Sequence, residues 1–457
     1  MQYFVTGATG FIGKRLVKTL LARRGTTVHF LVRPGSEGKI GELLEYWGVS
    51  KARAIAVSGD LTAKRLGVSA DDVKKLKGQI GAVYHLAAVY DLSADEESQA
   101  RVNIEGTRNM VEFAKAIDAK HVHHVSSIAA AGLYEGVFRE DMFDEAEGLD
   151  HPYFMTKHES EKIVRKECKV PWTVYRPAMV VGDSRTGEMD KIDGPYYFFK
   201  VIQRMRQILP PWFPSVGIEG GRVNIVPVDF VVAALDHISH SRHSVKGKCF
   251  HLVDPVGYRV GDVLDIFSRA AHAPKMNLFV NAALFGFIPK SVKKGLMALA
   301  PVRRVRAAVM KDLGLPEDFL QFINYPTRFD CRETEAALKG SGVECPNLKD
   351  YAWRLWDYWE RHLDPALFID RSLKGTVGGK VVLVTGGSSG IGLAAAIKFA
   401  EAGAITVICA RDEGKLAEAV KEIKAQAGKD AQVHAYSVDV ANEADCAEFL
   451  AKLHAEH

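Results

Sequence analysis

The hydrophobic pattern alternates short apolar runs, rich in β-branched residues, with longer amphipathic segments. The short runs predict β-strands, and the segments whose apolar residues recur at helical spacing predict α-helices. After an opening strand, further strands are expected at residues 27–32, 52–57, 82–86, 121–126 and 173–176. Such an alternation is typical of an α/β fold with a doubly wound parallel sheet and helices on both faces, the Rossmann fold.

The alternation loses its regularity beyond residue 183. From there to residue 370 the chain mixes prolines, aromatic residues and longer loops. This composition predicts a substrate-binding lobe over the carboxyl edge of the sheet. We therefore expect one domain over residues 1–370, with a nucleotide-binding core over about 1–180 and a substrate lobe mostly over 183–370.

A second unit of the same kind begins at residue 380. An apolar strand, a glycine-rich turn and a helix over residues 380–400 repeat the type of opening seen at residues 2–20. Residues 371–379 carry glycines among charges and are predicted to be a linker. The segment 380–457 is shorter than a complete doubly wound domain, so it is expected to be the N-terminal part of a second Rossmann domain.

Both glycine-rich turns lie between a predicted strand and a predicted helix, as in dinucleotide-binding sites. Glycine lets the backbone approach a pyrophosphate, and the helix N-terminus offers free N–H groups to the anion. The candidate cofactor-binding residues of the first turn are Thr6, Gly7, Thr9, Gly10, Phe11, Ile12 and Gly13. Those of the second turn are Gly386, Gly390, Ile391 and Gly392.

The residue after the second strand of each unit favours NADPH as the cofactor. Sites that prefer NAD place an acidic residue there, whereas this chain has Arg33 in the first unit and Arg411 in the second. A guanidinium can hold a ribose 2′-phosphate, although a solvated surface charge is the alternative for Arg33. Asp60, with its neighbour Leu61, and Asp439 each follow a strand and would cap the adenine amino group or simply lie solvated in a turn.

Tyr153 and Lys157 are spaced to lie one above the other on one helical face. The lysine ammonium would lower the pKa of the phenol, so that Tyr153 could give a proton to a carbonyl oxygen as hydride arrives. A YxxxK pattern alone is typical of a surface helix. Ser127, which ends an apolar strand 26 residues upstream of Tyr153, favours the catalytic interpretation. Its hydroxyl, rather than that of Ser126, would hydrogen-bond the substrate carbonyl.

The composition fits an ordinary globular protein, with 47% hydrophobic and 25% charged residues. A net charge of +4 is too small for a nucleic-acid-binding signature. The six cysteines form no CxxC pair, and the opening residues resemble a strand rather than a secretory signal, which together favour the cytoplasm. No metal site is expected, because strand alternation puts His121 and His123 on one face and His124 on the other.

Two further patterns are open to more than one interpretation. The basic amphipathic stretch over residues 278–309 would contact the inner face of an anionic membrane, guide the phosphates of coenzyme A, or form a solvated helix face. An aromatic cluster near residue 355 is favoured to pack in the core rather than to wall an acyl chain. Its members are Tyr351, Trp353, Trp356, Tyr358 and Trp359.

Several strings are together similar to the extended short-chain dehydrogenase/reductase superfamily over residues 1–370. They are TGATGFIG, HLAA at 85–88, NIEGT, VSSIAAAG, YxxxK and YRP at 175–177. The resemblance implies a catalytic triad of Ser127, Tyr153 and Lys157, with Asn103 tethering a proton-relay water. It also implies cofactor contacts from Lys157, Ala87, Arg176 and Pro177, the last two beside the nicotinamide.

Longer strings, among them FREDMFDEAE, DHPYFMTKHESEK, GEMDKIDGPYYFFK and INYPTRFD, resemble the bacterial alcohol-forming fatty acyl-CoA reductases. That resemblance implies NADPH-dependent reduction of fatty acyl-CoA through fatty aldehyde to fatty alcohol, a wax-ester precursor, by two fused reductase domains. The first domain would reduce the aldehyde, with Tyr153 as the proton donor. The alternatives are reduction of a sterol ketone or a carrier-bound acyl thioester, or a regulator that binds NADP without turnover. The oligomeric state stays open.

Overall fold

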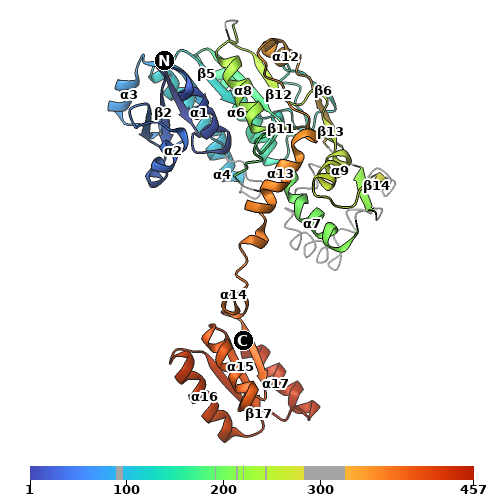
Figure 1. Cartoon of the computed structure of the whole chain (residues 1–457). Coiled ribbons are helices and arrows are strands. Elements are labelled where there is room, and N and C mark those ends of the chain that lie inside the picture. The colour runs from blue at the N-terminus through green and yellow to red at the C-terminus, as the bar shows by residue number, and fades with distance from the viewer. Residues whose placement is uncertain are drawn as a thin grey trace. The chain divides into compact units, whose positions relative to one another are not determined.

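The computed structural model describes residues 1–88, 96–190, 192–210, 212, 215–219, 221–241, 244–281 and 325–456. These residues form two units, Met1–Leu363 and Asp364–His457 (Figure 1). The division precedes the segment predicted as a linker, in which the short helix α14 (Leu373–Val377) lies.

A seven-stranded parallel sheet forms the centre of the first unit, in the order β12-β7-β5-β4-β1-β2-β3. The strands are β1 (Gln2–Thr6), β2 (Thr27–Val32), β3 (Ala54–Ser58), β4 (Ile80–His85), β5 (Val122–Val125), β7 (Trp172–Pro177) and β12 (Cys249–Leu252). This order confirms the predicted doubly wound Rossmann fold. Strand β12 was not predicted: it comes from the interval assigned to the lobe, because its four residues are too few to show a period.

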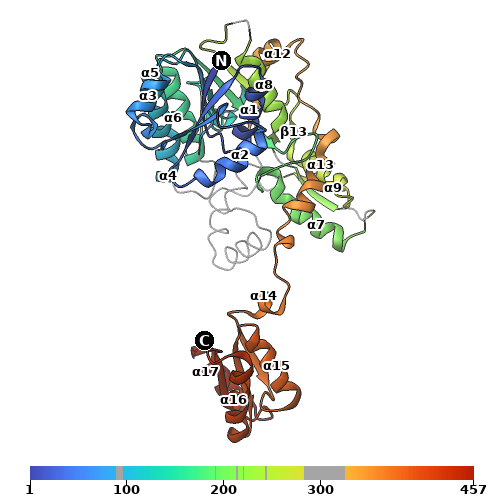
Figure 2. The ribbon, with the colours of Figure 1, turned by 60° about the vertical axis from the view of Figure 1, so that its left-hand side comes forward.

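Helices cover both faces of this sheet (Figure 2). One face packs on α1 (Phe11–Ala22), α2 (Ile40–Trp47) and α8 (Val228–Ser239). The other packs on α3 (Ala70–Leu76), α5 (Gly106–Ala116) and α6 (Pro152–Glu167). Neighbouring strand residues alternate between the two cores, so Phe4 lies in one and Val5 in the other.

The lobe has its own core, built around helices α7 (Phe199–Ile208), α9 (Val260–Ala270) and α13 (Leu348–His362). Tyr351, Trp356 and Trp359 of α13 are buried there, as predicted for core packing, whereas Trp353 is exposed. Within the described residues, the other α-helices of the unit are α4 (Glu96–Ala100) and α12 (Arg332–Leu338). The other strands form pairs: β8 (Met179–Val181) with β11 (Ile225–Pro227), β10 (Arg222–Val223) with β13 (Tyr258–Arg259), β9 (Ser215–Glu219) with β14 (Met276–Asn281), and β6 (Gly136–Phe138) with β15 (Thr327–Phe329).

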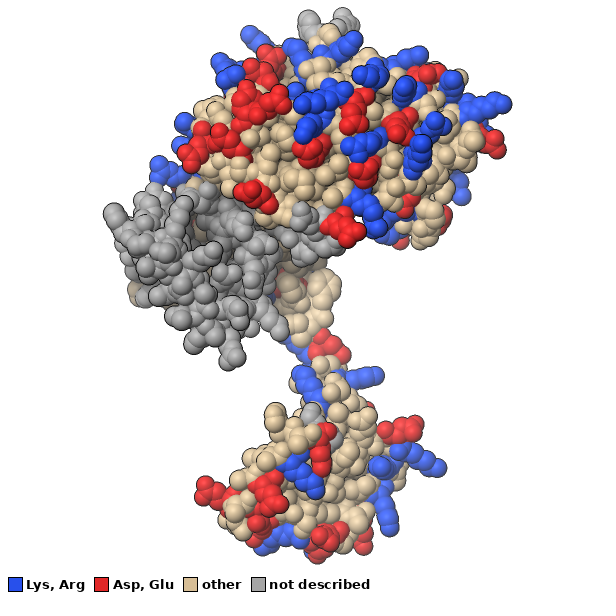
Figure 3. Space-filling view, turned by 180° about the vertical axis from the view of Figure 1, so that it is seen from behind, with Lys and Arg blue, Asp and Glu red and all other residues tan. Residues whose placement is uncertain are grey.

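The predicted basic stretch at 278–309 lies outside the described residues beyond position 281, so its contact with a membrane stays a prediction. Among the helices that the structure describes, none has the length and apolar character needed to cross a bilayer. On the face seen in Figure 3, basic and acidic side chains of the first unit are interspersed rather than gathered by sign.

The second unit is a three-stranded parallel sheet in the order β16-β17-β18. Its elements are β16 (Val381–Thr385), α15 (Gly390–Glu401), β17 (Ile405–Ala410), α16 (Glu413–Ala427), β18 (Val433–Ser437) and α17 (Glu443–Glu456). The sequence of strand, glycine turn, helix and strand repeats the opening of the first unit, as predicted from the two glycine-rich turns.

Candidate active site

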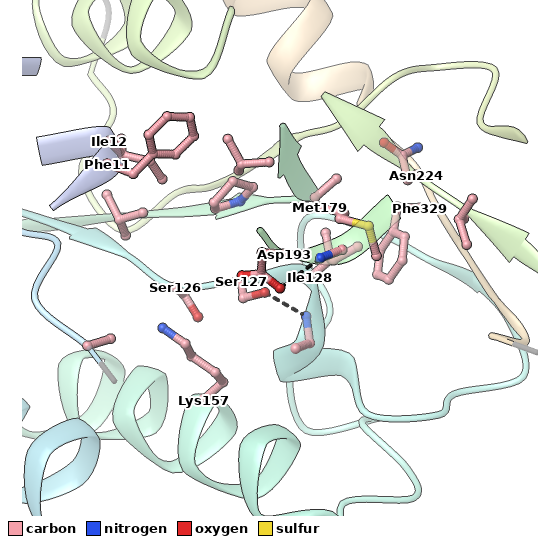
Figure 4. A pocket seen from close by; sticks show the side chains of 18 of the residues that line it. Phe11, Ile12, Ser126, Ser127, Ile128, Lys157, Met179, Asp193, Asn224 and Phe329 are labelled. Atoms are coloured by element: carbon pink, nitrogen blue, oxygen red, sulfur yellow. Dashed lines mark hydrogen bonds between the residues drawn. The ribbon is translucent and has the colours of Figure 1, made fainter. Parts of the chain in front are cut away.

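The first unit contains a cavity of about 640 Å³ between the carboxyl ends of its strands and the lobe (Figure 4). The glycine turn before α1, the end of β5 and the start of α6 form its wall on the sheet side. Residues of β8, β10 and β15 line it on the lobe side. Open α/β sheets bind their ligands outside the carboxyl ends of the strands, so this is the expected place for a site.

Ser127, Tyr153 and Lys157 all line this cavity. Helix α6 begins at Pro152, and the ring nitrogen Nδ1 of His151 accepts the backbone N–H of Tyr153 at 3.1 Å, so the tyrosine lies in the first turn. Ser127 follows β5 and caps a short 3₁₀ helix, accepting the N–H of Ala129 at 3.2 Å. The Tyr153 hydroxyl donates to Ser127 Oγ at 3.4 Å. The structure thus brings the three predicted catalytic residues together.

The electrostatics of this group differ from the sequence-based expectation. Burial raises the pKa of Tyr153 well above its usual value, a hydrogen bond to Ser127 opposes this, and the Asp193 carboxylate adds to it. Burial also lowers the pKa of Lys157 to about 8. Removal from water disfavours the charged form of both groups, so the pKa of Tyr153 is raised, whereas the sequence predicted that it would be lowered. The phenol is therefore held protonated, the form that a proton donor needs.

Figure 4 shows the Lys157 side chain extending from α6 toward Ser126 and Ser127. Within the described residues, the buried Oγ of Ser126 has no hydrogen-bond partner, whereas Ser127 bonds both Tyr153 and a backbone N–H. The structure therefore links Ser127, rather than Ser126, to the tyrosine.

Asn103 lies just outside the cavity, in a π-helical turn (Arg101–Glu105) between α4 and α5. Its side chain is buried, and Nδ2 donates to Thr156 Oγ1 at 3.3 Å. The threonine hydroxyl donates in turn to the carbonyl of Tyr153 at 3.2 Å. Asn103 thus contacts α6 next to Lys157, where its predicted role in a proton relay remains a prediction.

The first glycine turn is shaped by close backbone approaches. Gly7 has φ +76°, and a Cβ there would lie 2.6 Å from the backbone nitrogen of Ala87. A Cβ on Gly13 would lie 2.0 Å from the carbonyl oxygen of Gly7. Only glycine fits at these two positions of the turn. The turn lines the cavity with Gly7, Thr9, Gly10, Phe11, Ile12 and Gly13. These residues fit a dinucleotide pyrophosphate at the start of α1.

Two predicted cofactor residues near this turn do not line the cavity. Thr6 is fully buried, and its hydroxyl shares a hydrogen bond of 2.7 Å with Nδ1 of His85. Ala87 packs its backbone against Gly7. Both residues support the turn from behind instead of forming the cavity wall.

Arg33, Asp60 and Leu61 lie at the carboxyl ends of the neighbouring strands β2 and β3, away from the cavity wall. Arg33 is exposed. The Asp60 carboxylate accepts the backbone N–H and the hydroxyl of Thr62, both at 2.8 Å, and these bonds lower its pKa, with a smaller contribution from Arg33. The carbonyl of Leu61 accepts Asn109 Nδ2 at 2.8 Å. The two strand ends thus place the predicted ribose and adenine contacts side by side.

The Arg176 side chain is not beside the cavity, and its predicted contact near the nicotinamide is corrected. It is fully buried and pairs with Glu161, with Nε to Oε2 at 2.9 Å and Nη2 to Oε1 at 2.6 Å. Strand alternation explains this placement: Arg176 shares the face of Val174, under α6. Pro177 points the other way and does line the cavity.

His123 and His124 of β5, and His121 directly before it, lie on the faces predicted for them. His121 and His123 stack with ring centroids 4.5 Å apart, and His124 stacks on His85 at 5.4 Å on the other face. Within the part of the chain that the structure describes, no three His, Cys, Asp or Glu side chains are grouped as metal ligands would be.

The second unit repeats the glycine turn of the first. Gly386 and Gly390 have positive φ, and a Cβ on Gly392 would lie 2.2 Å from the carbonyl oxygen of Gly386. Ile391 is 92% exposed, and Arg411 is exposed at the end of β17. The Asp439 carboxylate accepts the N–H of Ala441 at 3.1 Å, as an aspartate in a turn does. The predicted cofactor contacts of the second unit remain predictions.

The lobe side of the cavity was not predicted residue by residue. Asp193, Tyr325 and Phe329 line it, and they lie within the strings GEMDKIDGPYYFFK and INYPTRFD that carried the narrower resemblance. Those strings were the only signal for them, because residues from a loop and a short edge strand follow no period. The wall also includes Met179, Arg222, Asn224 and Arg328.

Two family models match the chain. A model of an NAD-binding family described as male sterility protein matches residues 5–235. A second, described as short chain dehydrogenase, matches residues 380–457, which is most of the second unit. Each of the two matched ranges therefore includes one of the two glycine-rich turns.

Relatives among curated proteins include a subunit of linear gramicidin synthase from Brevibacillus parabrevis, 31% identical over 55% of this chain and 5% of its own length. Aldehyde reductase lnbA of Aspergillus flavus is 30% identical over 56% of this chain and 26% of its own. Glycine betaine reductase ATRR of Emericella nidulans is 27% identical over 92% of this chain and 34% of its own, so that match extends into both units. The chain spans about a third or less of the length of each.

Among solved structures, the terminal R domain from the myxalamid PKS-NRPS biosynthetic pathway is similar, with a TM-score of 0.62 and 25% identity. That match covers 80% of this chain and 92% of the other. A thiolation-reductase di-domain from an archaeal non-ribosomal peptide synthetase has a TM-score of 0.59 at 18% identity, over 79% of this chain and 75% of its own. The second likeness shows the shared fold.

Proposed function

Because this chain belongs to the NAD-binding family described as male sterility protein, we propose that its first unit is an NADPH-dependent reductase of acyl thioesters and their aldehydes. The observation that carries the proposal is the cavity in which Ser127, Tyr153 and Lys157 face the glycine turn. A redox cofactor and a proton donor are the two parts that carbonyl reduction requires.

The residues of the cavity divide the chemistry between them. The reduced nicotinamide, when bound, supplies hydride to the carbonyl carbon. The Ser127 hydroxyl hydrogen-bonds the carbonyl oxygen and orients it, and Tyr153 donates a proton to that oxygen. The Lys157 ammonium lies beside them and compensates the charge that the phenol leaves behind. One hydride and one proton convert a thioester to an aldehyde and a free thiol, and a second pair converts the aldehyde to an alcohol.

The preference for NADPH rests on Arg33. Its exposed guanidinium stands at the end of β2 and has no ion-pair partner within the described residues. A 2′-phosphate on the adenine ribose would supply one, with charge-assisted hydrogen bonds.

A thioester on a carrier protein is the substrate that we favour. This choice is supported by the likeness to the gramicidin synthase and to the terminal R domain. Fatty acyl-CoA is the second candidate, since Phe11, Met179 and Phe329 give the cavity an apolar wall that suits an acyl chain (Figure 4).

Product analysis tests the proposal. The full chain is incubated with NADPH and, separately, a decanoyl carrier protein, decanoyl-CoA and decanal, and cofactor oxidation and products are followed. We expect the carrier-bound thioester to be reduced with the highest kcat/KM. Reduction of decanal alone would restrict the first unit to the aldehyde step, as the sequence strings implied. Reduction of none of the three, despite NADPH binding, would contradict the proposal.

A further inference from the structure

The lobe side of the cavity carries two arginines that carbonyl reduction does not use. Arg222, on β10, and Arg328, on β15, both line the cavity and are exposed to solvent. Neither has a hydrogen bond or an ion pair from its side chain within the described residues. Two cations on the wall of one cavity attract an anionic part of a ligand.

A third arginine lies on the strand that pairs with β10. Arg222 lies directly opposite Arg259 in the antiparallel pair of β10 with β13, so the two side chains emerge on the same face. Like charges in that position repel each other. The Arg259 side chain is not on the cavity wall, so the positive charge of this wall comes from Arg222 and Arg328.

Acidic residues on the cavity wall are already engaged. Asp190 pairs with Lys14 at 2.8 Å. Asp193 accepts the N–H of Gly194 at 2.7 Å, and Asp254 accepts that of Val256 at 2.9 Å. The two backbone bonds hold the Asp193 and Asp254 carboxylates on their own loops, and the Lys14 pair holds Asp190 against α1. Within the described residues, none of the three forms an ion pair with Arg222 or Arg328.

The lobe-side wall lies apart from the glycine turn, which indicates that an elongated ligand would fit the cavity. Figure 4 shows Asn224 and Phe329 on the other side of the pocket from Phe11 and Ile12. Phe329 directly follows Arg328 in the chain, and Asn224 is two residues after Arg222. Asn224 is fixed there, because its amide donates to the carbonyl of Asp254 at 2.7 Å and accepts that residue's N–H at 2.8 Å. An elongated ligand with its carbonyl at Ser127 would reach this fixed wall with its far end.

We propose that Arg222 and Arg328 form a subsite for the phosphate of a phosphopantetheine arm. The inference rests on the proposed thioester reduction. Acyl-CoA and carrier-bound acyl groups share this arm, which separates the thioester from a phosphodiester or diphosphate. A guanidinium binds phosphate oxygens in a planar, bidentate geometry. Free aldehydes have no phosphate, so the subsite selects thioesters over aldehydes.

Calorimetric titration of the full chain, saturated with NADP⁺, tests the subsite without turnover. The probes are 4′-phosphopantetheine and pantetheine, which differ only in the phosphate. We expect the phosphorylated probe to bind about tenfold more tightly, since charge-assisted hydrogen bonds are worth that much or more. The double variant Arg222→Gln/Arg328→Gln should bind the two probes equally. The charge-matched variant Arg24→Gln/Lys51→Gln, at exposed positions off the cavity, should keep the difference.

Equal affinity of the wild type for both probes, or binding of neither, would overturn the subsite. So would a phosphate preference that survives in the double variant. Decanal reduction by the double variant should match the wild type, which separates failure of the subsite from failure of the reductase. Titration with coenzyme A and with a phosphopantetheinylated carrier protein then identifies which source of the arm binds more tightly.

Discussion

The Tyr153 hydroxyl lies 3.4 Å from the Ser127 hydroxyl oxygen, across the gap between the start of α6 and the end of β5. These residues come from different elements, so their meeting depends on the packing of α6 beside the sheet. A carbonyl oxygen between the two hydroxyls would accept a hydrogen bond from each.

Replacing Tyr153 by phenylalanine removes the proton donor and leaves the ring. We expect kcat/KM for decanal to fall by about 10²–10⁴-fold, the usual contribution of general acid catalysis, with NADPH affinity unchanged. Stopped-flow measurement of NADPH oxidation reads the rate. Tyr134→Phe, which alters a tyrosine off the cavity wall, is the control, and an equal loss there would contradict the assignment.

Lys157 should make stability depend on pH. Burial lowers its pKa to about 8 from 10.5, so between these values the unfolded chain binds more protons than the folded one. Stability therefore rises as pH increases from about 8 to about 10.5. Lys157→Met should be more stable than the wild type at pH 7, on the order of 3 kcal/mol, and this advantage should shrink toward pH 10.5. Urea unfolding at several pH values measures it, and a pH-independent difference would refute the explanation.

Arg33 should set the choice of cofactor. Arg33→Ala is expected to weaken NADPH binding by about tenfold or more and to leave NADH binding unchanged, since only NADPH carries the 2′-phosphate. Fluorescence titration with both cofactors reads the ratio. Lys39→Ala, an exposed cation further along the chain, should leave that ratio unaltered.

Gly7 should be irreplaceable for a reason beyond its φ angle. In Gly7→Ala the new Cβ would lie 2.6 Å from the Ala87 nitrogen, which displaces the turn, so NADPH affinity should drop by about tenfold or more. Gly25→Ala isolates the backbone effect, because Gly25 has φ +70° but no atom near the added Cβ. That control should lose stability and keep its cofactor affinity, as judged by titration.

The buried pair of Arg176 and Glu161 should matter for stability. Both side chains are fully buried, so Glu161→Gln leaves the guanidinium without a compensating charge and should destabilise the fold by about 3–5 kcal/mol. Glu159→Gln, on the same helix with a carboxylate that is 37% exposed, should cost less than about 1 kcal/mol. Chemical denaturation of both variants gives their free energies of unfolding. Similar losses in the two variants would show that the buried pair does not cause the loss in Glu161→Gln.

The sequence predicted those parts of the molecule that follow a period or a motif. Strand β2 has its predicted bounds, and the spacing of Tyr153 and Lys157 predicted the face that lines the cavity. Arg176 was misplaced, because a motif gives the order of residues and not which side of a strand each one faces. Asp193 and Tyr325 could not be assigned, since their position depends on how the lobe packs over the sheet.

The π-helical turn at Asn103 separates α4 from α5, and its irregular hydrogen bonding has a consequence for the position of the Asn103 side chain. Deleting one residue from Arg101–Glu105 would let α4 and α5 join as one continuous α-helix. Every residue before the deletion would then rotate by roughly 100° relative to those after it. The amide of Asn103 and the hydroxyl of Thr156 could not both keep their places. The extra residue of the π-helical turn therefore places Asn103 where its amide can reach Thr156 of α6, 53 residues further along the chain.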